Sequence, residues 1–173
     1  MRSVAKMNVQ RLTKIAEWLE AGAPHVGIVT GFDMQNFIRE GDAIGTNECG
    51  TSCCIAGAAV QFKQQREHRR RYRNTSELVG MLWENEKLRS EYGNSSEHHE
   101  AAFLARKDLG LTADQARKLF YGNYKQRRCW RQIPLHEINA AWAARTIRHL
   151  IKTGKVDWIK TAPKGSPYRL VRE

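Results

Sequence analysis

The sequence has no apolar run long enough to cross a membrane. Its longest apolar stretch is about Cys53–Val60, whereas a membrane-spanning helix needs roughly 18 or more apolar residues in a row. The first eight residues, MRSVAKMN, also lack the apolar core of a secretory signal peptide. Proteins that are not exported keep their thiols reduced. We therefore expect a cytoplasmic protein with free cysteines and no membrane partner.

The first part of the chain has few basic residues, and the second part has many. Residues 1–60 carry five Lys/Arg against six Asp/Glu, whereas residues 61–173 carry 24 against 12, so the net charge of +11 arises entirely after residue 60. A positive field concentrated on one part of a chain attracts polyanions. Nucleic acid is the commonest such partner in a cytoplasm. The apolar content of 41% and the charged content of 27% are those of a globular protein.

Apolar residues recur mainly at helical spacing, which predicts a mainly α, compact multi-helix domain. The expected helices cover residues 9–19, from about 53 into the Arg-rich segment, 74–92, 97–109, 112–121 and 134–153. Residues 25–32 form either a short strand or a loop, Asp33 caps a short helix, and residues 123–133 form an irregular connector.

Several helix ends carry specific signals. Thr112 with Gln115 forms a capping-box pattern, and Gly110 is expected in the left-handed conformation that ends a helix. Thr51 or Ser52 is expected to cap the second helix. Pro134 suits the first turn of the last helix.

The C-terminal residues predict a short β-hairpin, with strands at 156–160 and 168–171 around a Pro-Gly turn. A long helix followed by such a hairpin imitates the end of a winged helix, in which the helix enters the major groove and the hairpin touches the backbone. A packing helix followed by an ordinary hairpin is the favoured alternative. We divide the chain into a helical domain, residues 1–158, and a C-terminal hairpin or tail, residues 159–173. In the winged-helix interpretation the DNA-facing residues are Arg145, Arg148, Lys152, Lys160, Lys164 and Arg169.

Three of the four cysteines fall within six positions, at Cys49, Cys53 and Cys54. A thiol near the start of a helix is favoured as a thiolate, so a cysteine-dependent enzyme would use Cys49 or Cys54 with His98 or His99 as its base. The papain pattern has two residues between its cysteines, however, whereas Cys49 and Cys53 are separated by three. No Asn or Asp partner stands out. We therefore favour a protein without catalytic residues.

The same cysteines could join Cys129 and His98 or His99 in a zinc site, but the paired short spacings of structural zinc sites are absent. We expect no metal and no cofactor. A packing role explains more residues, because residues 56–59 are Ala-Gly-Ala-Ala and let a neighbouring helix approach closely. Free cysteine behaves as a small buried hydrophobe and extends that surface.

The motif Cys49-Gly-Thr-x-x-Cys-Ile-Ala-Gly57 resembles the signature of a family of small, uncharacterised proteins found in tailed phages and bacteria. In that family the motif precedes a Leu-Gly-Leu-Thr…Gln-Ala…Leu-Phe segment, here residues 109–120, and an Ala-rich helix that ends in Thr-Gly-x-Val-Asp-Trp, here residues 153–158. The resemblance covers pieces of residues 48–158. It implies a phage or prophage setting and no particular activity. The Arg-rich segment and the residues after Trp158 depart from the pattern.

Two basic segments, residues 61–73 and 124–131, interleave cations with aromatic residues. Guanidinium groups can hold phosphates while aromatic faces stack on unpaired bases. The residues expected to contact phosphate are Arg66, Arg69, Arg70, Arg71, Arg73, Lys125, Arg127, Arg128 and Arg131, and those expected to stack are Tyr72, Tyr124 and Trp130.

We therefore predict a non-enzymatic basic protein that binds RNA or DNA. Either basic segment by itself is more often a solvated helix face or a loop that plugs the core. Two alternatives remain at this point: a module that binds an acidic surface of a host protein, and the cysteine-dependent enzyme.

Overall fold

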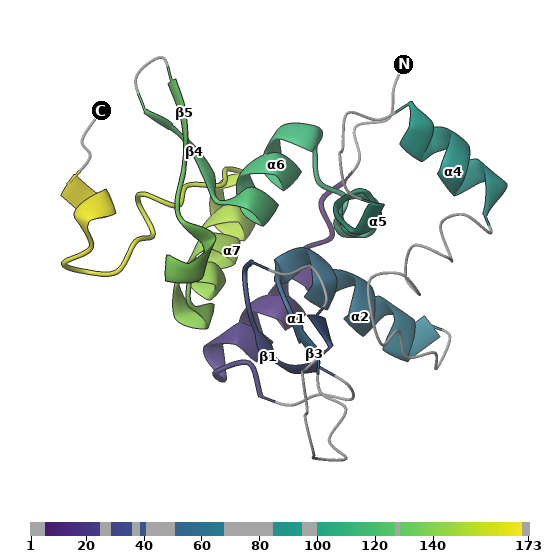
Figure 1. Cartoon of the computed structure of the whole chain (residues 1–173), viewed down its shortest axis with the longest axis horizontal. Coiled ribbons are helices and arrows are strands. Elements are labelled where there is room, and N and C mark those ends of the chain that lie inside the picture. Colours follow the sequence, from purple (N-terminus) through teal and green to yellow (C-terminus); the bar gives the residue numbers. More distant parts are fainter. Residues whose placement is uncertain are drawn as a thin grey trace.

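The computed structural model describes residues 6–24, 29–35, 39–40, 51–67, 85–94, 100–126 and 129–170. Helix dominates these residues, which confirms the mainly α prediction, and the strands form two small sheets (Figure 1). The helices are α1 (Val9–Glu20), α2 (Ile55–Glu67), α4 (Glu86–Gly93), α5 (Glu100–Leu109), α6 (Ala113–Tyr121) and α7 (Ala140–Thr153).

The first sheet has the strand order β1-β3-β2, with β1 (Val29–Phe32), β2 (Arg39–Glu40) and β3 (Thr51–Cys53). Strand β3 pairs in parallel with β1 and antiparallel with β2. The prediction that Thr51 or Ser52 caps α2 is wrong, because both residues belong to β3, the central strand. Helix α2 begins at Ile55, two residues after the end of β3. In its first hydrogen bond, the backbone N–H of Ala58 donates to the carbonyl of Cys54 at 2.9 Å.

The second sheet is an antiparallel hairpin of β4 (Asn123–Gln126) and β5 (Cys129–Gln132). The prediction of an irregular connector at residues 123–133 is therefore wrong. Gly122, in the left-handed conformation at φ 64°, ends α6 and turns the chain directly into β4. The molecule thus has a short hairpin near its C-terminus, but the described part of the expected hairpin, residues 156–170, contains no strand.

The residues after α7 form turns and the 3₁₀ helix η2 (Pro167–Leu170) in place of strands. Trp158 explains the difference. Its side chain is fully buried, its indole N–H donates to the carbonyl of Lys118 at 2.7 Å, and its own carbonyl accepts from the indole of Trp142 at 3.0 Å. These bonds hold the segment against α6 and α7, so the strands of the winged-helix interpretation do not form in residues 156–170.

Helix ends lie where the sequence predicts them when a few neighbouring residues determine the geometry. Thr112 and Gln115 form both bonds of the capping box, and Gly110 is left-handed at φ 61°. Two starts differ from prediction. Asn85 caps α4, which begins at Glu86, so the prediction of a single helix over residues 74–92 is wrong. Pro134 precedes a short 3₁₀ helix, η1 (Leu135–Glu137), and Asn139 caps α7.

The short helix predicted after Asp33 begins as a turn at residues 34–35, in which the Asp33 carboxylate accepts from the Gln35 N–H at 2.9 Å. Its remaining residues, 36–38, lie outside the described part of the chain. The division at residue 158 stays a prediction. Residues after it contact α7, since Arg145 donates to the carbonyl of Thr161 at 3.0 Å and Tyr168 packs on Trp142.

The core forms around the start of α2, where every residue from Cys53 to Gln61 is buried. A helix that is apolar on all sides belongs inside a protein, and α2 is enclosed by α1, α5, α6 and the first sheet. The burial of Cys53 and Cys54 confirms the packing interpretation of these two thiols.

The left-handed glycines give a test of the fold. A Cβ added to Gly110 would lie 2.2 Å from the carbonyl oxygen of Lys6, whereas a Cβ on Gly154 meets nothing within 4 Å. Both have positive φ, which costs about 1 kcal/mol for a residue with a side chain. We expect Gly154→Ala to lose about that much stability and Gly110→Ala clearly more, by at least about 2 kcal/mol. Urea unfolding followed by circular dichroism measures both; equal losses would contradict the close approach at Gly110.

Candidate nucleic-acid interface

The β4–β5 hairpin brings cations and aromatic residues onto adjacent rungs of one ladder. Its register pairs Tyr124 with Arg131 and Lys125 with Trp130. Residues directly opposite each other in an antiparallel pair have Cβ atoms about 5 Å apart. Each aromatic residue of the hairpin is therefore paired with a cationic one. Tyr124 is half-buried and Arg131 is exposed.

The base of this hairpin is tied to α6. The N–H of Ile133 donates to the carbonyl of Gly122 at 3.1 Å, and the side-chain amide of Gln132 donates to the carbonyl of Tyr121 at 2.9 Å. The second bond satisfies a carbonyl at the C-terminal end of α6, where the helix itself offers no donor. These contacts hold the hairpin as an extension of the helical body.

Residues 111–170 carry 13 Lys/Arg against three Asp/Glu, and each acidic side chain has a local partner. Asp114 binds Lys118 at 2.7 Å and Arg117 at 3.2 Å. Burial by itself would raise the pKa of Asp114, but the hydrogen bonds from these two cations outweigh it and lower the pKa. The Asp157 carboxylate accepts from the backbone N–H of Lys160 at 2.9 Å. Three carboxylates offset only a small part of the 13 positive charges in these residues.

The third acidic residue, Glu137, lies beside the phenol of Tyr168. Burial is the main cause that raises the pKa of Tyr168. A hydrogen bond to Glu137 and the proximity of Tyr124 raise it further. Tyr168 is half-buried and its ring lies 5.7 Å from that of Trp142. The C-terminal segment thus approaches the hairpin. Sequence reasoning missed Tyr168 as a neighbour of Tyr124, because nothing in the local pattern links residues so far apart.

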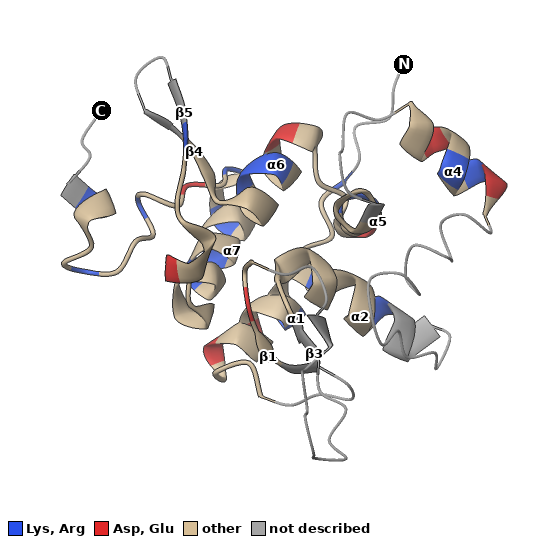
Figure 2. Ribbon diagram, viewed as in Figure 1, with Lys and Arg blue, Asp and Glu red and all other residues tan. Residues whose placement is uncertain are grey.

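The cations of α7 are partly engaged within the protein. Arg148 forms a two-point contact with the Glu20 carboxylate of α1, at 2.9 and 2.8 Å, and this hydrogen bonding lowers the pKa of Glu20. Arg145 donates to the backbone, and Lys152 is exposed. The predicted DNA-facing row of Arg145, Arg148 and Lys152 therefore has its central member committed to another helix. Figure 2 shows basic residues on α6, α7 and the segment that follows.

The structure describes only part of the predicted site. Arg66 lies near the end of α2, which Figure 1 places far from the hairpin, and its side chain is not among those described. Of the other predicted contacts, the hairpin brings together Tyr124, Lys125, Trp130 and Arg131. The predicted residues outside the described part of the chain are Cys49, Arg69, Arg70, Arg71, Tyr72, Arg73, His98, His99, Arg127 and Arg128.

Cys54 stands at the position from which a helix N-terminus would activate a thiol. The backbone N–H groups of Gly57 and Ala56 do favour its thiolate, but burial and the nearby Asp33 carboxylate oppose them. Burial is the largest effect and raises the pKa of Cys54 to about 11. Burial likewise raises the pKa of Cys53, as does the adjacent thiol. Both side chains therefore stay protonated and shielded near neutral pH, the opposite of an activated nucleophile.

The raised pKa makes stability depend on pH. An unfolded Cys54 ionises near its ordinary pKa of 9.0, whereas the folded thiol holds its proton to about pH 11. Its contribution is complete below pH 9 and is lost as pH rises toward 11. We expect the unfolding free energy to fall by roughly 2 kcal/mol more across this range in the native sequence than in Cys54→Ala. Urea unfolding at pH 7, 9, 10 and 11 measures the difference; identical pH dependence would rule out a shielded thiol.

Within the described residues, no group of three or more His, Cys, Asp and Glu side chains is arranged to hold a metal ion. The described helices include none that combines the length and the apolar character needed to span a membrane. No protein-family model, curated protein or solved structure matches the chain. The resemblance to the phage and bacterial family therefore stays a prediction.

Proposed function

We propose that the protein binds nucleic acid without catalysis, through the β4–β5 hairpin, whose two faces carry the pairs Tyr124–Arg131 and Lys125–Trp130. The observation that carries the proposal is the β4–β5 register, which pairs Tyr124 with Arg131 and Lys125 with Trp130. Cations supply sequence-independent attraction to phosphates, and aromatic faces supply stacking on bases. Adjacent rungs belong to opposite faces of a hairpin, so each face offers one cation and one aromatic residue, which suit one phosphate and one base.

The charge of the surrounding residues supports the same partner. Residues 111–170 have a net charge of +10, from 13 Lys/Arg and three Asp/Glu. A field of one sign raises the local concentration of a polyanion and speeds its encounter with the surface. We include a phage-type setting and a cytoplasmic location in the proposal, on the sequence grounds given above.

An acidic host protein is the competing partner, because it would be attracted by the same charges. Stacking separates the two, since a protein surface offers no row of unpaired bases to Tyr124 and Trp130. Cysteine catalysis by Cys54 is disfavoured, because the thiol is 2% exposed and its pKa is raised to about 11.

Arg131→Gln removes one exposed cation from the hairpin, and Arg89→Gln removes one exposed cation from α4 as a matched control. We expect Arg131→Gln to weaken binding to a single-stranded oligonucleotide and to reduce the slope of log K against log salt by about 0.7. Arg89→Gln should leave that slope nearly unchanged. Fluorescence anisotropy from 20 to 200 mM salt measures both. Absence of binding at the lowest salt would overturn the proposal, and equal losses in both variants would reduce it to a net-charge effect.

Tyr124→Leu tests stacking separately, because leucine keeps an apolar side chain at a half-buried position. Base–aromatic stacking contributes about 1–3 kcal/mol per base, so we expect at least fivefold weaker binding with an unchanged salt slope. The control is the thermal midpoint of unfolding, which should stay close to that of the native sequence. Unchanged affinity for every strand would rule out stacking by Tyr124.

A further inference from the structure

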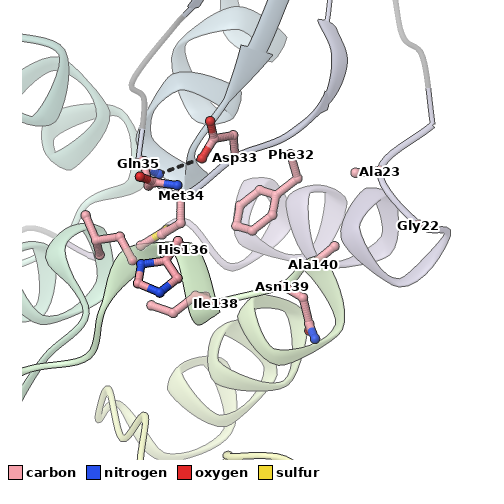
Figure 3. Close-up of a pocket in the computed structure, with 11 residues that line it drawn as sticks. Gly22, Ala23, Phe32, Asp33, Met34, Gln35, His136, Ile138, Asn139 and Ala140 are labelled. Carbon is pink, nitrogen blue, oxygen red and sulfur yellow. Dashed lines mark hydrogen bonds between the residues drawn. The ribbon is translucent and has the colours of Figure 1, made fainter.

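A pocket of about 310 Å³ lies where the end of α1, the end of β1 and the start of α7 meet (Figure 3). Phe32 lies on one side, and Met34, His136 and Ile138 lie on the other, with Gln35 beside Met34. The volume is at the lower end of the range for small-molecule sites. It suits a single ring system better than a larger cofactor.

The walls of the pocket are held by contacts of the protein itself. Met34 and Ile138 are each 3% exposed, and the ring of Trp18 packs edge-on against Phe32 at 6.5 Å. The Trp18 indole also donates to the carbonyl of Pro24 at 2.8 Å, which holds the turn after α1. In that turn Ala23 has a positive φ of 53°. A residue other than glycine in this conformation is strained, and such strain is often found at functional sites.

The pocket adjoins the hairpin surface. Gly122 directly precedes β4, and a Cβ placed on it would lie 3.1 Å from Cδ1 of Ile138 and 3.3 Å from Cδ2 of Leu135. Both of these side chains line the pocket. The backbone that enters the hairpin therefore packs directly against the pocket wall.

We propose that this pocket takes one unpaired nucleobase of the bound strand, an inference that rests on the proposed function. The ring of Phe32 offers an apolar face to a flat heterocycle, and Met34 and Ile138, each 3% exposed, offer only a small apolar edge. The Gln35 amide and the His136 imidazole offer hydrogen-bond donors and acceptors of the kind that read base edges.

The Asp33 carboxylate also lines the pocket and disfavours a phosphate there. Its charge leaves the base as the part of a nucleotide that enters, while the phosphates stay with the cations outside. A carboxylate can accept hydrogen bonds from more than one donor, so its bond from the Gln35 N–H is compatible with a further bond from a base amino group.

The test combines two variants with two strands. Gln35→Ala/His136→Ala removes two exposed side chains from the pocket, and Gln10→Ala/His149→Ala makes the same changes outside the pocket lining. Each protein is titrated with a ten-residue single strand and with a strand of equal length made of abasic sugar-phosphates. We expect the pocket variant to bind the base-bearing strand about five- to tenfold more weakly than the native sequence. Its affinity for the abasic strand should be unchanged, as should both affinities of the control.

A second measurement needs no phosphate contacts. With ¹³C-labelled methionine methyl groups, each of the four nucleosides should be tested for a shift of the Met34 signal, which a stacked base would move. We expect a shift in the native sequence and in the control, and none in the pocket variant. A pocket variant that binds the base-bearing strand as tightly as the native sequence, or a Met34 signal unmoved by every nucleoside, overturns the inference. Absence of binding to either strand at low salt overturns the proposed function instead, and the nucleoside measurement then decides the pocket by itself.

Discussion

The close approach of α2 and α5 is the constraint on which the rest of the structure depends. The two helices are in close contact, and both carry buried alanines: Ala56, Ala58, Ala101, Ala102 and Ala105 are all at most 2% exposed. Small residues let helix backbones approach closely, and tight packing makes any added methylene group costly. The start of α2 is thereby enclosed. The same packing places strand β3, which leads into α2. Because β1 pairs with β3, it also places the turn after β1, which forms one wall of the pocket.

A buried carboxylate joins the helices at this centre. Asp108 of α5 is only 5% exposed on its side chain and contacts Arg11 of α1 and, at 3.4 Å, Lys63 of α2. A buried charge is tolerated only when it is paired, and removal of one partner destabilises strongly. Three helices are therefore tied at one point by groups that cannot separate without leaving a charge unpaired. The N–H of Asn8 donates to the carbonyl of Leu109 at 2.8 Å and adds a backbone tie between the start of α1 and the end of α5.

Sequence reasoning succeeded where a few neighbouring residues decide the geometry, as at the Thr112 capping box and the left-handed glycines. It failed at residues 123–132 because both faces of that hairpin are largely polar, so the alternation that marks a half-buried strand is absent. It failed after α7 because the indole of Trp158 bonds to the carbonyl of Lys118, 40 positions away in the chain. Of the candidate site, the sequence shows which residue types are present but not the register that pairs them. Phe32 and Ile138 lie in segments more than a hundred residues apart, so no local pattern predicts the pocket between them.

The burial that raises the pKa of Cys54 also shields the centre of the fold from ligands. Packing that excludes water raises the pKa of the Cys54 thiol to about 11. Side chains in the centre of the fold therefore cannot reach a ligand, whereas those at its edge can. There the charges differ in sign, because the hairpin carries Lys125 and Arg131, whereas Asp33 lines the pocket. A duplex offers phosphates with its bases already paired and stacked, so only the cations would contribute to binding it. Under the proposed function, a single strand would place phosphates on the hairpin and a base in the pocket, so the proposal favours single-stranded over duplex nucleic acid.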